Sequence, residues 1–148
     1  MVKNNSMDNI KFMGTAEAQN IGDQFTTTIK SNSFEYVADE PEAIGGKNIG
    51  PSSGDYLCMA LASCKAMTLR MYVKRKQWKV ESINVKVKLV KGPQSPSGLN
   101  TFYSEINVTG SFDEEQEKRM LYIAKACPIS RLLQKQNEVV TTLVKNKN

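Results

Sequence analysis

The feature that most constrains the fold of this chain is an almost unbroken apolar run over residues 56–67, which continues as a helical pattern to about residue 77. Its first half is apolar on nearly every side, so most sides of the expected helix must be covered. Six residues form one stripe at helical spacing: Leu57, Ala60, Leu61, Cys64, Met67 and Met71. A chain of 148 residues does not easily supply that cover alone. We therefore predict a homodimer in which the central helices of two chains pack together.

The rest of the chain shows the patterns of an α+β fold. Residues 25–29 and 34–38 alternate between apolar and polar side chains, which predicts two strands, and a turn at Gly22 would join them to an earlier strand over residues 10–17. After the helix, which begins at Ser52 or Ser53, residues 83–89 and 102–108 predict a hairpin with a long exposed loop.

The last quarter of the chain predicts two helices and a strand. Ser111 and Glu114 have the spacing of a capping box, Pro128 fits the first position of a second, short helix, and residues 138–144 alternate as a closing strand would. No linker or repeat divides the chain. We therefore expect a single α+β domain over residues 1–148, with antiparallel sheets around the long helix.

The chain contains three cysteines and no histidine. The absence of histidine excludes a Ser-His-Asp triad, a Cys-His pair and any histidine-ligated metal site. If the chain performs chemistry, sulfur is the expected agent, and a group other than histidine must activate it. We expect no bound cofactor and no metal.

Cys64 has two interpretations. On the core side of a helix a cysteine is commonly a small, inert hydrophobic residue, because burial raises its pKa. It lies about three turns from the start of the helix, so the helix dipole gives it little help, and activation would require a cation from another segment. Cys58 is six positions earlier, about 240° away around the helix, and is interpreted as structural.

Cys127 is better placed by local rules. As the residue before Pro128 it would occupy the N-cap of the following helix, where unpaired backbone N–H groups favour a thiolate. The alternative is that it merely fills the joint between two helices. Local pattern leaves both interpretations open.

The net charge and the distribution of apolar residues bear on the expected partners and location. The net charge of +5 and the basic residues at 70–79 raise nucleic acid as a partner, but no recognition motif accompanies them, so we favour a solvated surface and no nucleic-acid binding. No run is long and apolar enough to span a membrane. The polar start has no apolar segment of the kind found in a signal peptide, so we expect a cytoplasmic protein.

Several motifs, in this order, resemble the OsmC/Ohr family, the osmotically inducible and organic hydroperoxide resistance proteins that act in stress responses. They are Asp39-Glu40-Pro41, Gly45-Gly46, Gly50-Pro51, residues 59–72 around Ala62-Ser63-Cys64, residues 74–78, and Ala126-Cys127-Pro128-Ile129-Ser130. The resemblance covers most of the chain, about residues 26–143. Both cysteine motifs take part in it, which makes it fairly specific.

The resemblance implies an OsmC-like fold that forms an intertwined homodimer around long central helices. It also implies a thiol-dependent peroxidase that reduces small organic or lipid hydroperoxides. Carried over by position, Cys64 is the nucleophile that becomes a sulfenic acid, and Cys127 is the resolving cysteine that condenses with it to a disulfide. An external dithiol then reduces that disulfide.

The sequence departs from the family pattern in the residues that activate the nucleophile. The peroxidases of the family use an N-terminal arginine, oriented by a glutamate early in the cysteine helix, whereas the first arginine here is Arg70. Lys30 or Lys47 could take the place of that arginine, and Asp55 is the nearest match to the glutamate. The alternative function is a dimeric small-molecule-binding protein of the same fold with little or no catalysis.

Overall fold

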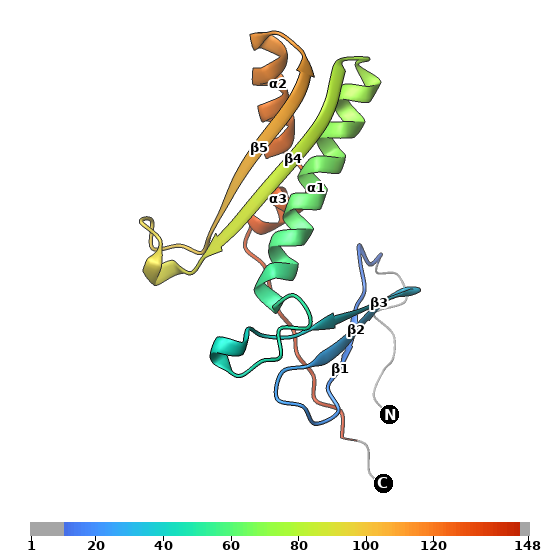
Figure 1. Ribbon diagram of the computed structural model, residues 1–148, viewed down its shortest axis with the longest axis vertical. Coiled ribbons are helices and arrows are strands. Elements are labelled where there is room, and N and C mark those ends of the chain that lie inside the picture. The colour runs from blue at the N-terminus through green and yellow to red at the C-terminus, as the bar shows by residue number, and fades with distance from the viewer. Residues whose placement is uncertain (1–10, 146–148) are drawn as a thin grey trace. The chain divides into compact units, whose positions relative to one another are not determined.

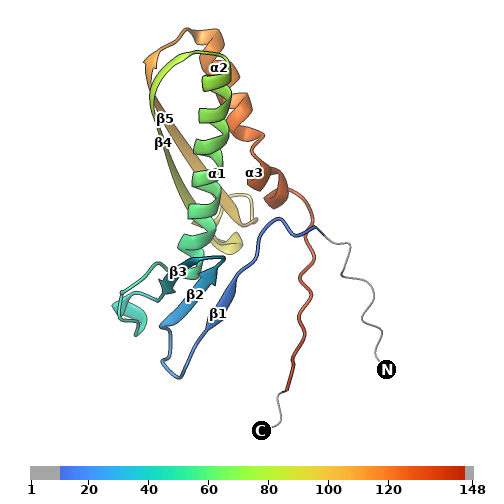
Figure 2. The same ribbon diagram turned by 90° about the vertical axis from the view of Figure 1, so that its right-hand side faces the viewer.

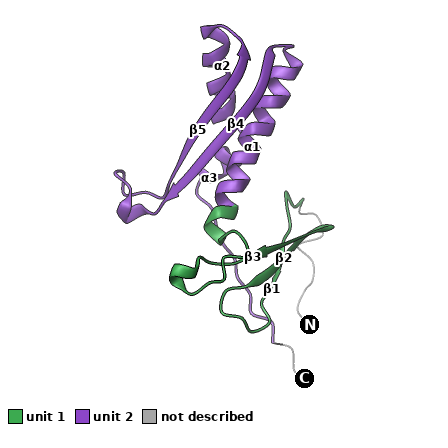
Figure 3. Cartoon of the chain, in the orientation of Figure 1, with its two compact units in different colours: residues 1–56 green, residues 57–148 purple. Residues whose placement is uncertain are grey.

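The computed structural model describes residues 11–145, and the chain divides into two compact units, Met1–Tyr56 and Leu57–Asn148. Figure 3 shows the units in two colours. The helix that carries the cysteine motif begins in the first unit and continues through the second. Each unit is described by itself below.

The N-terminal unit contains a three-stranded antiparallel meander. Its strands are β1 (Glu17–Gln19), β2 (Thr27–Ser31) and β3 (Phe34–Ala38), in the order β1-β2-β3, followed by the short 3-10 helix η1 (Glu42–Ile44). This confirms the second and third predicted strands. The first is shorter than expected, because β2 offers partners only to residues 17–19. Residue 10 lies outside the described residues.

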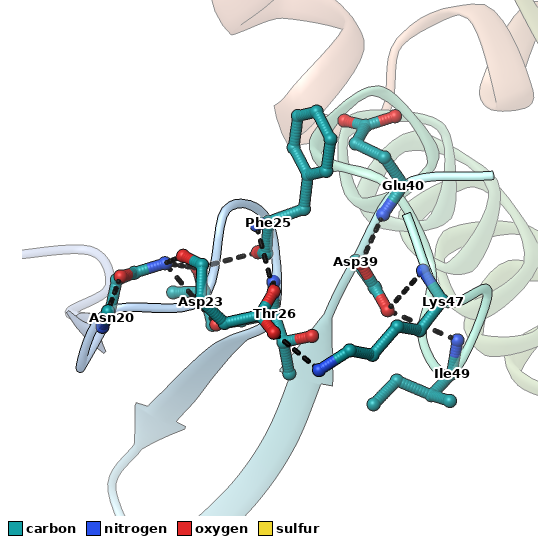
Figure 4. Close-up of polar contacts among 10 residues, drawn as sticks. Asn20, Asp23, Phe25, Thr26, Asp39, Glu40, Lys47 and Ile49 are labelled. Atoms are coloured by element: carbon teal, nitrogen blue, oxygen red, sulfur yellow. Dashed lines mark hydrogen bonds and ion pairs between the residues drawn. The ribbon is translucent and has the colours of Figure 1, made fainter. Parts of the chain in front are cut away.

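A tight loop follows β3 and is closed around one buried carboxylate. Asp39 is only 2% exposed and accepts backbone N–H groups from Glu40, Lys47 and Ile49 (Figure 4). The glycine-rich sequence has a steric reason. A Cβ at Gly46 would lie 1.8 Å from the carbonyl oxygen of Glu40, so this loop can close only around a glycine.

A second carboxylate organises the turn between β1 and β2. Asp23 accepts the backbone N–H groups of Phe25 and Thr26, and its other oxygen forms an ion pair with Lys47 (Figure 4). The Lys47 hydrogen bond, with these backbone donors, holds the pKa of Asp23 well below its usual value. The turn and the loop of the N-terminal unit are thus fastened to each other.

The long helix α1 (Ser53–Arg75) contains 23 residues, as the apolar run predicts. At its start the Ser52 hydroxyl accepts the backbone N–H of Asp55, and the Asp55 carboxylate accepts both the backbone N–H and the hydroxyl of Ser52. It ends two residues before the predicted end, where Gln77 takes a left-handed conformation with φ of 56°. No helix among residues 11–145 is both long and apolar enough to cross a bilayer.

The second unit is built on the predicted hairpin. Strands β4 (Lys79–Val90) and β5 (Thr101–Ser111) pair antiparallel, with Val85 opposite Ile106, and the loop between them contains the 3-10 helix η2 (Gly92–Gln94). Helices α2 (Glu114–Lys125) and α3 (Pro128–Leu133) follow. Helices α1 and α2 lie side by side against one face of the hairpin (Figures 1 and 2). This confirms an α+β fold with antiparallel sheets.

The core of the second unit lies between this face and the two helices. Leu69 and Val73 of α1 are each 1% exposed and pack with Met120 of α2. Burying side chains of this size stabilises the fold by about 1.5–3 kcal/mol each. The cap of α2 differs from the predicted one: Asp113 and Gln116 form the capping box, two residues after the Ser111–Glu114 spacing.

The buried side of α1 shares only Leu61 with the predicted stripe. Its buried residues are Leu61, Lys65, Leu69, Tyr72 and Val73. The predicted stripe is largely exposed in this chain, with Leu57, Met67 and Met71 between 50% and 73% exposed. Because the helix is apolar on both sides, its pattern could not tell which side the hairpin covers.

The predicted closing strand at residues 138–144 is wrong for the chain described here. This segment has no regular secondary structure, and Val139 and Leu143 are 88% and 94% exposed. A strand exists only where a neighbouring strand completes its ladder of hydrogen bonds. No strand among residues 11–145 pairs with it.

Candidate active site

Cys127 lies at the joint between α2 and α3 and is 0% exposed. It is the N-cap of α3, as predicted: its backbone is extended, Pro128 occupies the first turn, and the Ser130 backbone N–H donates to the Cys127 sulfur at 3.4 Å. Pro128 suits this place because it has no N–H to leave unsatisfied. The sulfur therefore accepts the backbone N–H that a side-chain oxygen accepts at most helix N-caps.

The neighbouring cation is Lys65, on the buried side of α1. Only 6% of this residue is exposed. Its Nζ donates to the carbonyl oxygen of Ala124 at 3.0 Å and to the hydroxyl of Ser130 at 2.8 Å. Both acceptors are neutral, and no carboxylate among residues 11–145 forms an ion pair with Lys65. A buried ammonium thus lies in the joint that holds Cys127.

The environment of Cys127 favours its thiolate. Burial raises the pKa of the Cys127 thiol, but hydrogen bonds from the Ser130 hydroxyl and backbone N–H, a hydrogen bond with Cys64 and the charge of Lys65 lower it. Together they hold its pKa below the usual value. The groups that act on this sulfur therefore come from both α1 and α3.

The structure brings Cys64 and Cys127 together. Cys64 is half-buried on α1, next to Lys65 in sequence, and it lies close enough to Cys127 to help lower the pKa of the Cys127 thiol. Cys58 is also half-buried, but it does not contribute to this cluster. All three cysteines are free. Two of them form a pair at a joint between helices.

A pocket of about 380 Å³ is lined by Lys65 and Ser130, the two residues that hydrogen-bond to each other at this joint. Leu61 of α1, Leu133 of α3 and several residues at the loop end of the hairpin, among them Leu99 and Phe102, complete its lining. Its lining mixes apolar side chains with hydroxyl groups, so a small molecule with an apolar body and a polar end fits its chemistry. Among residues 11–145 no three cysteine or carboxylate side chains lie together as metal ligands would.

The other predicted site residues lie in the N-terminal unit. Asp55 is exposed and its carboxylate is engaged by Ser52, whose hydroxyl and backbone N–H lower its pKa. Lys47 forms an ion pair with Asp23, and Lys30 forms one with Glu35 at 3.1 Å. Asp55, Lys47 and Lys30 therefore each form a hydrogen bond or an ion pair with a residue of the N-terminal unit.

Lys65 and Ser130 were not among the predicted site residues. Lys65 carries a signal that could have revealed it, because it is the only charged residue between Asp55 and Arg70 in an otherwise apolar run. A lysine in such a run is buried only if other groups accept its hydrogen bonds. Ser130 is three residues after a predicted N-cap, the position whose backbone N–H a capping group accepts.

Fold and site together define a small α+β protein with a pair of neighbouring thiols. The family profile described as OsmC-like protein matches residues 45–142. The chain belongs to this family. No curated protein sequence matches the chain.

Solved structures share the fold at low sequence identity. An OsmC like protein from Mycoplasma pneumoniae is 17% identical, with a TM-score of 0.67 over 84% of this chain and 89% of the other. An organic hydroperoxide resistance protein from Elizabethkingia anophelis is 20% identical, with a TM-score of 0.63 over 85% and 91%. The organic hydroperoxide resistance protein OhrB of Bacillus subtilis is 18% identical, with a TM-score of 0.57 over 83% and 91%. At these identities the likeness establishes the fold.

Proposed function

We propose that this protein is a thiol-dependent peroxidase that reduces organic hydroperoxides, with Cys64 as nucleophile and Cys127 as resolving cysteine. The Cys64 thiolate attacks the outer peroxide oxygen, the O–O bond breaks, and the alcohol leaves with one proton. Cys64 is then a sulfenic acid. The Cys127 thiolate attacks the Cys64 sulfur, water leaves after one proton is taken up, and a disulfide forms. An external dithiol reduces that disulfide by exchange.

The observation that supports this proposal is the proximity of the two thiols, because Cys64 is close enough to help lower the pKa of Cys127. Cys64 is the half-buried member of the pair, and Cys127 is the fully buried one. That difference suits a nucleophile and a resolving partner, respectively. The proposal also draws on the two hydroperoxide resistance proteins that share the fold.

The proposal includes a cytoplasmic homodimer. One side of α1 remains uncovered in the single chain, with Leu57, Met59, Met67 and Met71 at 50–73% exposure. Met67 and Met71 also line an open apolar groove of about 410 Å³ with Ala66, Arg70 and Ile83. A second copy of this helix would cover the exposed side and remove its apolar surface from water.

Mass spectrometry of the cysteines tests the peroxidase activity. Reduced protein is treated with cumene hydroperoxide for seconds, quenched with an alkylating reagent and digested. We expect a Cys64–Cys127 disulfide in the native protein, and a Cys64 sulfenic acid in Cys127→Ser. Cys58→Ser is the matched control from the same helix and should react as the native protein does. Oxidation of Cys64 no faster than in protein unfolded in urea would contradict the proposal.

The alternative is a dimeric binding protein of the same fold with little or no turnover. It is favoured by the ion pairs of Lys30 and Lys47, since a lysine held by a carboxylate is less available to activate a distant thiol. It predicts that Cys64→Ser keeps the thermal stabilisation produced by a bound small molecule. It also predicts background peroxide consumption in both forms.

A further inference from the structure

The proposed reaction of Cys64 and Cys127 with a hydroperoxide assigns no role to the buried ammonium of Lys65. An ammonium removed from water without an opposite charge costs several kcal/mol, so chains rarely bury one alone. Lys65 has three N–H donors, and two of them reach Ala124 and Ser130. These acceptors satisfy hydrogen bonds but do not balance the charge. The charge of Lys65 lowers the pKa of Cys127, so the ionised Cys127 sulfur is a negative group close enough to compensate that charge.

Ser130 joins the cation to that sulfur. Its hydroxyl accepts from Lys65 Nζ at 2.8 Å. Its backbone N–H donates to the Cys127 sulfur at 3.4 Å. Lys65 and the Cys127 sulfur are therefore linked through one residue, and the Ser130 hydroxyl also helps to lower the pKa of Cys127.

We propose that Lys65 is the counter-ion of the Cys127 thiolate and, resting on the proposed function, the proton donor for disulfide formation. In that step the Cys127 thiolate forms a bond to the Cys64 sulfur and the S–O bond of the sulfenic acid breaks. The electron pair of that bond leaves on oxygen as hydroxide. Lys65 gives it one proton, which yields water and a neutral amine, and the amine regains its proton from solvent through the neighbouring pocket. Charge and atoms balance without a further reactant.

Lys65 differs in role from Lys30 or Lys47, the two lysines considered as replacements for the missing arginine. Those two lysines would act on the attacking cysteine, whereas Lys65 acts on the resolving one. The burial of Cys127 suits this role, because a thiolate that is 0% exposed is protected from reagents until Cys64 is oxidised. Lys65 positions the resolving sulfur and stabilises its negative charge, and it does not contact the peroxide.

The first experiment titrates Cys127 as the only thiol. In the Cys58→Ser, Cys64→Ser variant, thiolate absorbance at 240 nm against pH reports Cys127 alone. Adding Lys65→Met should raise the pKa of Cys127 by about one unit or more, the effect of losing a close opposite charge. Lys65→Arg, which keeps the charge, should leave it within about 0.3 units. The matched control is Lys74→Met, an exposed lysine on the same helix. An unchanged pKa in Lys65→Met would overturn the proposal.

The second experiment separates resolution from attack. In rapid-mixing experiments with cumene hydroperoxide, Lys65→Met should form the sulfenic acid at the native rate but convert it to disulfide about tenfold more slowly. Equal slowing of both steps would overturn the specific role in resolution. If no sulfenic acid forms even in the native protein, the proposed function fails. The titration would still decide whether Lys65 is the counter-ion of Cys127. Circular dichroism confirms that each variant is folded.

Discussion

Lys65 and Ser130, which lie 65 positions apart in the sequence, are joined by a buried hydrogen bond of 2.8 Å between Nζ and the hydroxyl oxygen. This contact ties the middle of α1 to the first turn of α3. It also places a positive charge in the joint where Cys127 is held. The contact therefore bears both on the stability of the fold and on the pKa of Cys127. A substitution can be measured for each effect.

Ser130→Ala should affect stability and thiol chemistry together. It removes one acceptor of the buried ammonium and one donor to the Cys127 sulfur. We expect the free energy of unfolding to fall by about 1–3 kcal/mol and the pKa of Cys127 to rise. Urea unfolding and thiolate absorbance measure the two effects. Ser63→Ala is the control, because Ser63 is exposed and bonds only within its own helix turn. A native-like titration in Ser130→Ala would show that its hydroxyl does not reach the sulfur.

Gly46→Ala should disrupt the loop that closes around Asp39. A methyl group there would overlap the Glu40 carbonyl oxygen, so the loop must open and lose the backbone bonds to Asp39. We expect destabilisation on the order of 2 kcal/mol, measured by thermal unfolding. Gly14→Ala is the comparison, since nothing lies within 4 Å of its added methyl, and it should change stability by less than about 0.5 kcal/mol. Equal effects of the two substitutions would contradict this steric account.

Met71→Glu should dissociate the proposed homodimer without unfolding the chain. Met71 is 73% exposed in the single chain, so a charge there costs little unless a second copy covers it. Sedimentation should show monomer for Met71→Glu and dimer for the native protein and for Lys74→Glu, an exposed control on the same helix. A dimeric Met71→Glu would show that this side of α1 is not the interface.

Acid should weaken the N-terminal unit through Asp23. Its Lys47 hydrogen bond and backbone donors hold its pKa below the ordinary 3.8, so the carboxylate binds fewer protons in the folded state. Its contribution is therefore complete above that ordinary value and is lost as the pH falls through the lower, folded-state pKa. Asp23→Asn should flatten the fall of stability between about pH 5 and pH 2.5, measured by urea unfolding. An unchanged slope would show that the ion pair with Lys47 is not maintained in solution.

Local patterns predicted most elements because each rests on neighbouring residues. The alternation of apolar and polar residues predicted the hairpin, the apolar run predicted α1, and the Cys127-Pro128 pair predicted the N-cap of α3. The side of α1 that faces the hairpin was not predictable in this way. Both sides are apolar, and which one the hairpin covers depends on contacts with residues as distant in sequence as Met120.

The sequence motifs pointed to Cys64 and Cys127, whose catalytic roles stay predictions, and they did not point to the neighbouring cation. The two thiols lie close enough for Cys64 to act on the pKa of Cys127. The position of the family's arginine pointed to Lys30 and Lys47, whereas the buried ammonium is beside Cys64 in the sequence. A lysine beside a cysteine on a helix points in another direction, so only the packing of α1 against α2 and α3 shows that Lys65 reaches Ala124 and Ser130, on either side of Cys127.

If Cys127 forms the proposed disulfide, the hydrogen bond that caps α3 changes with it. A thiolate is a strong acceptor for the Ser130 amide, and a disulfide sulfur is a weak one. The Ser130 amide resonance should therefore shift upfield when Cys127 is oxidised. A single nuclear magnetic resonance peak would then report the oxidation state of Cys127 in intact protein, without any added dye.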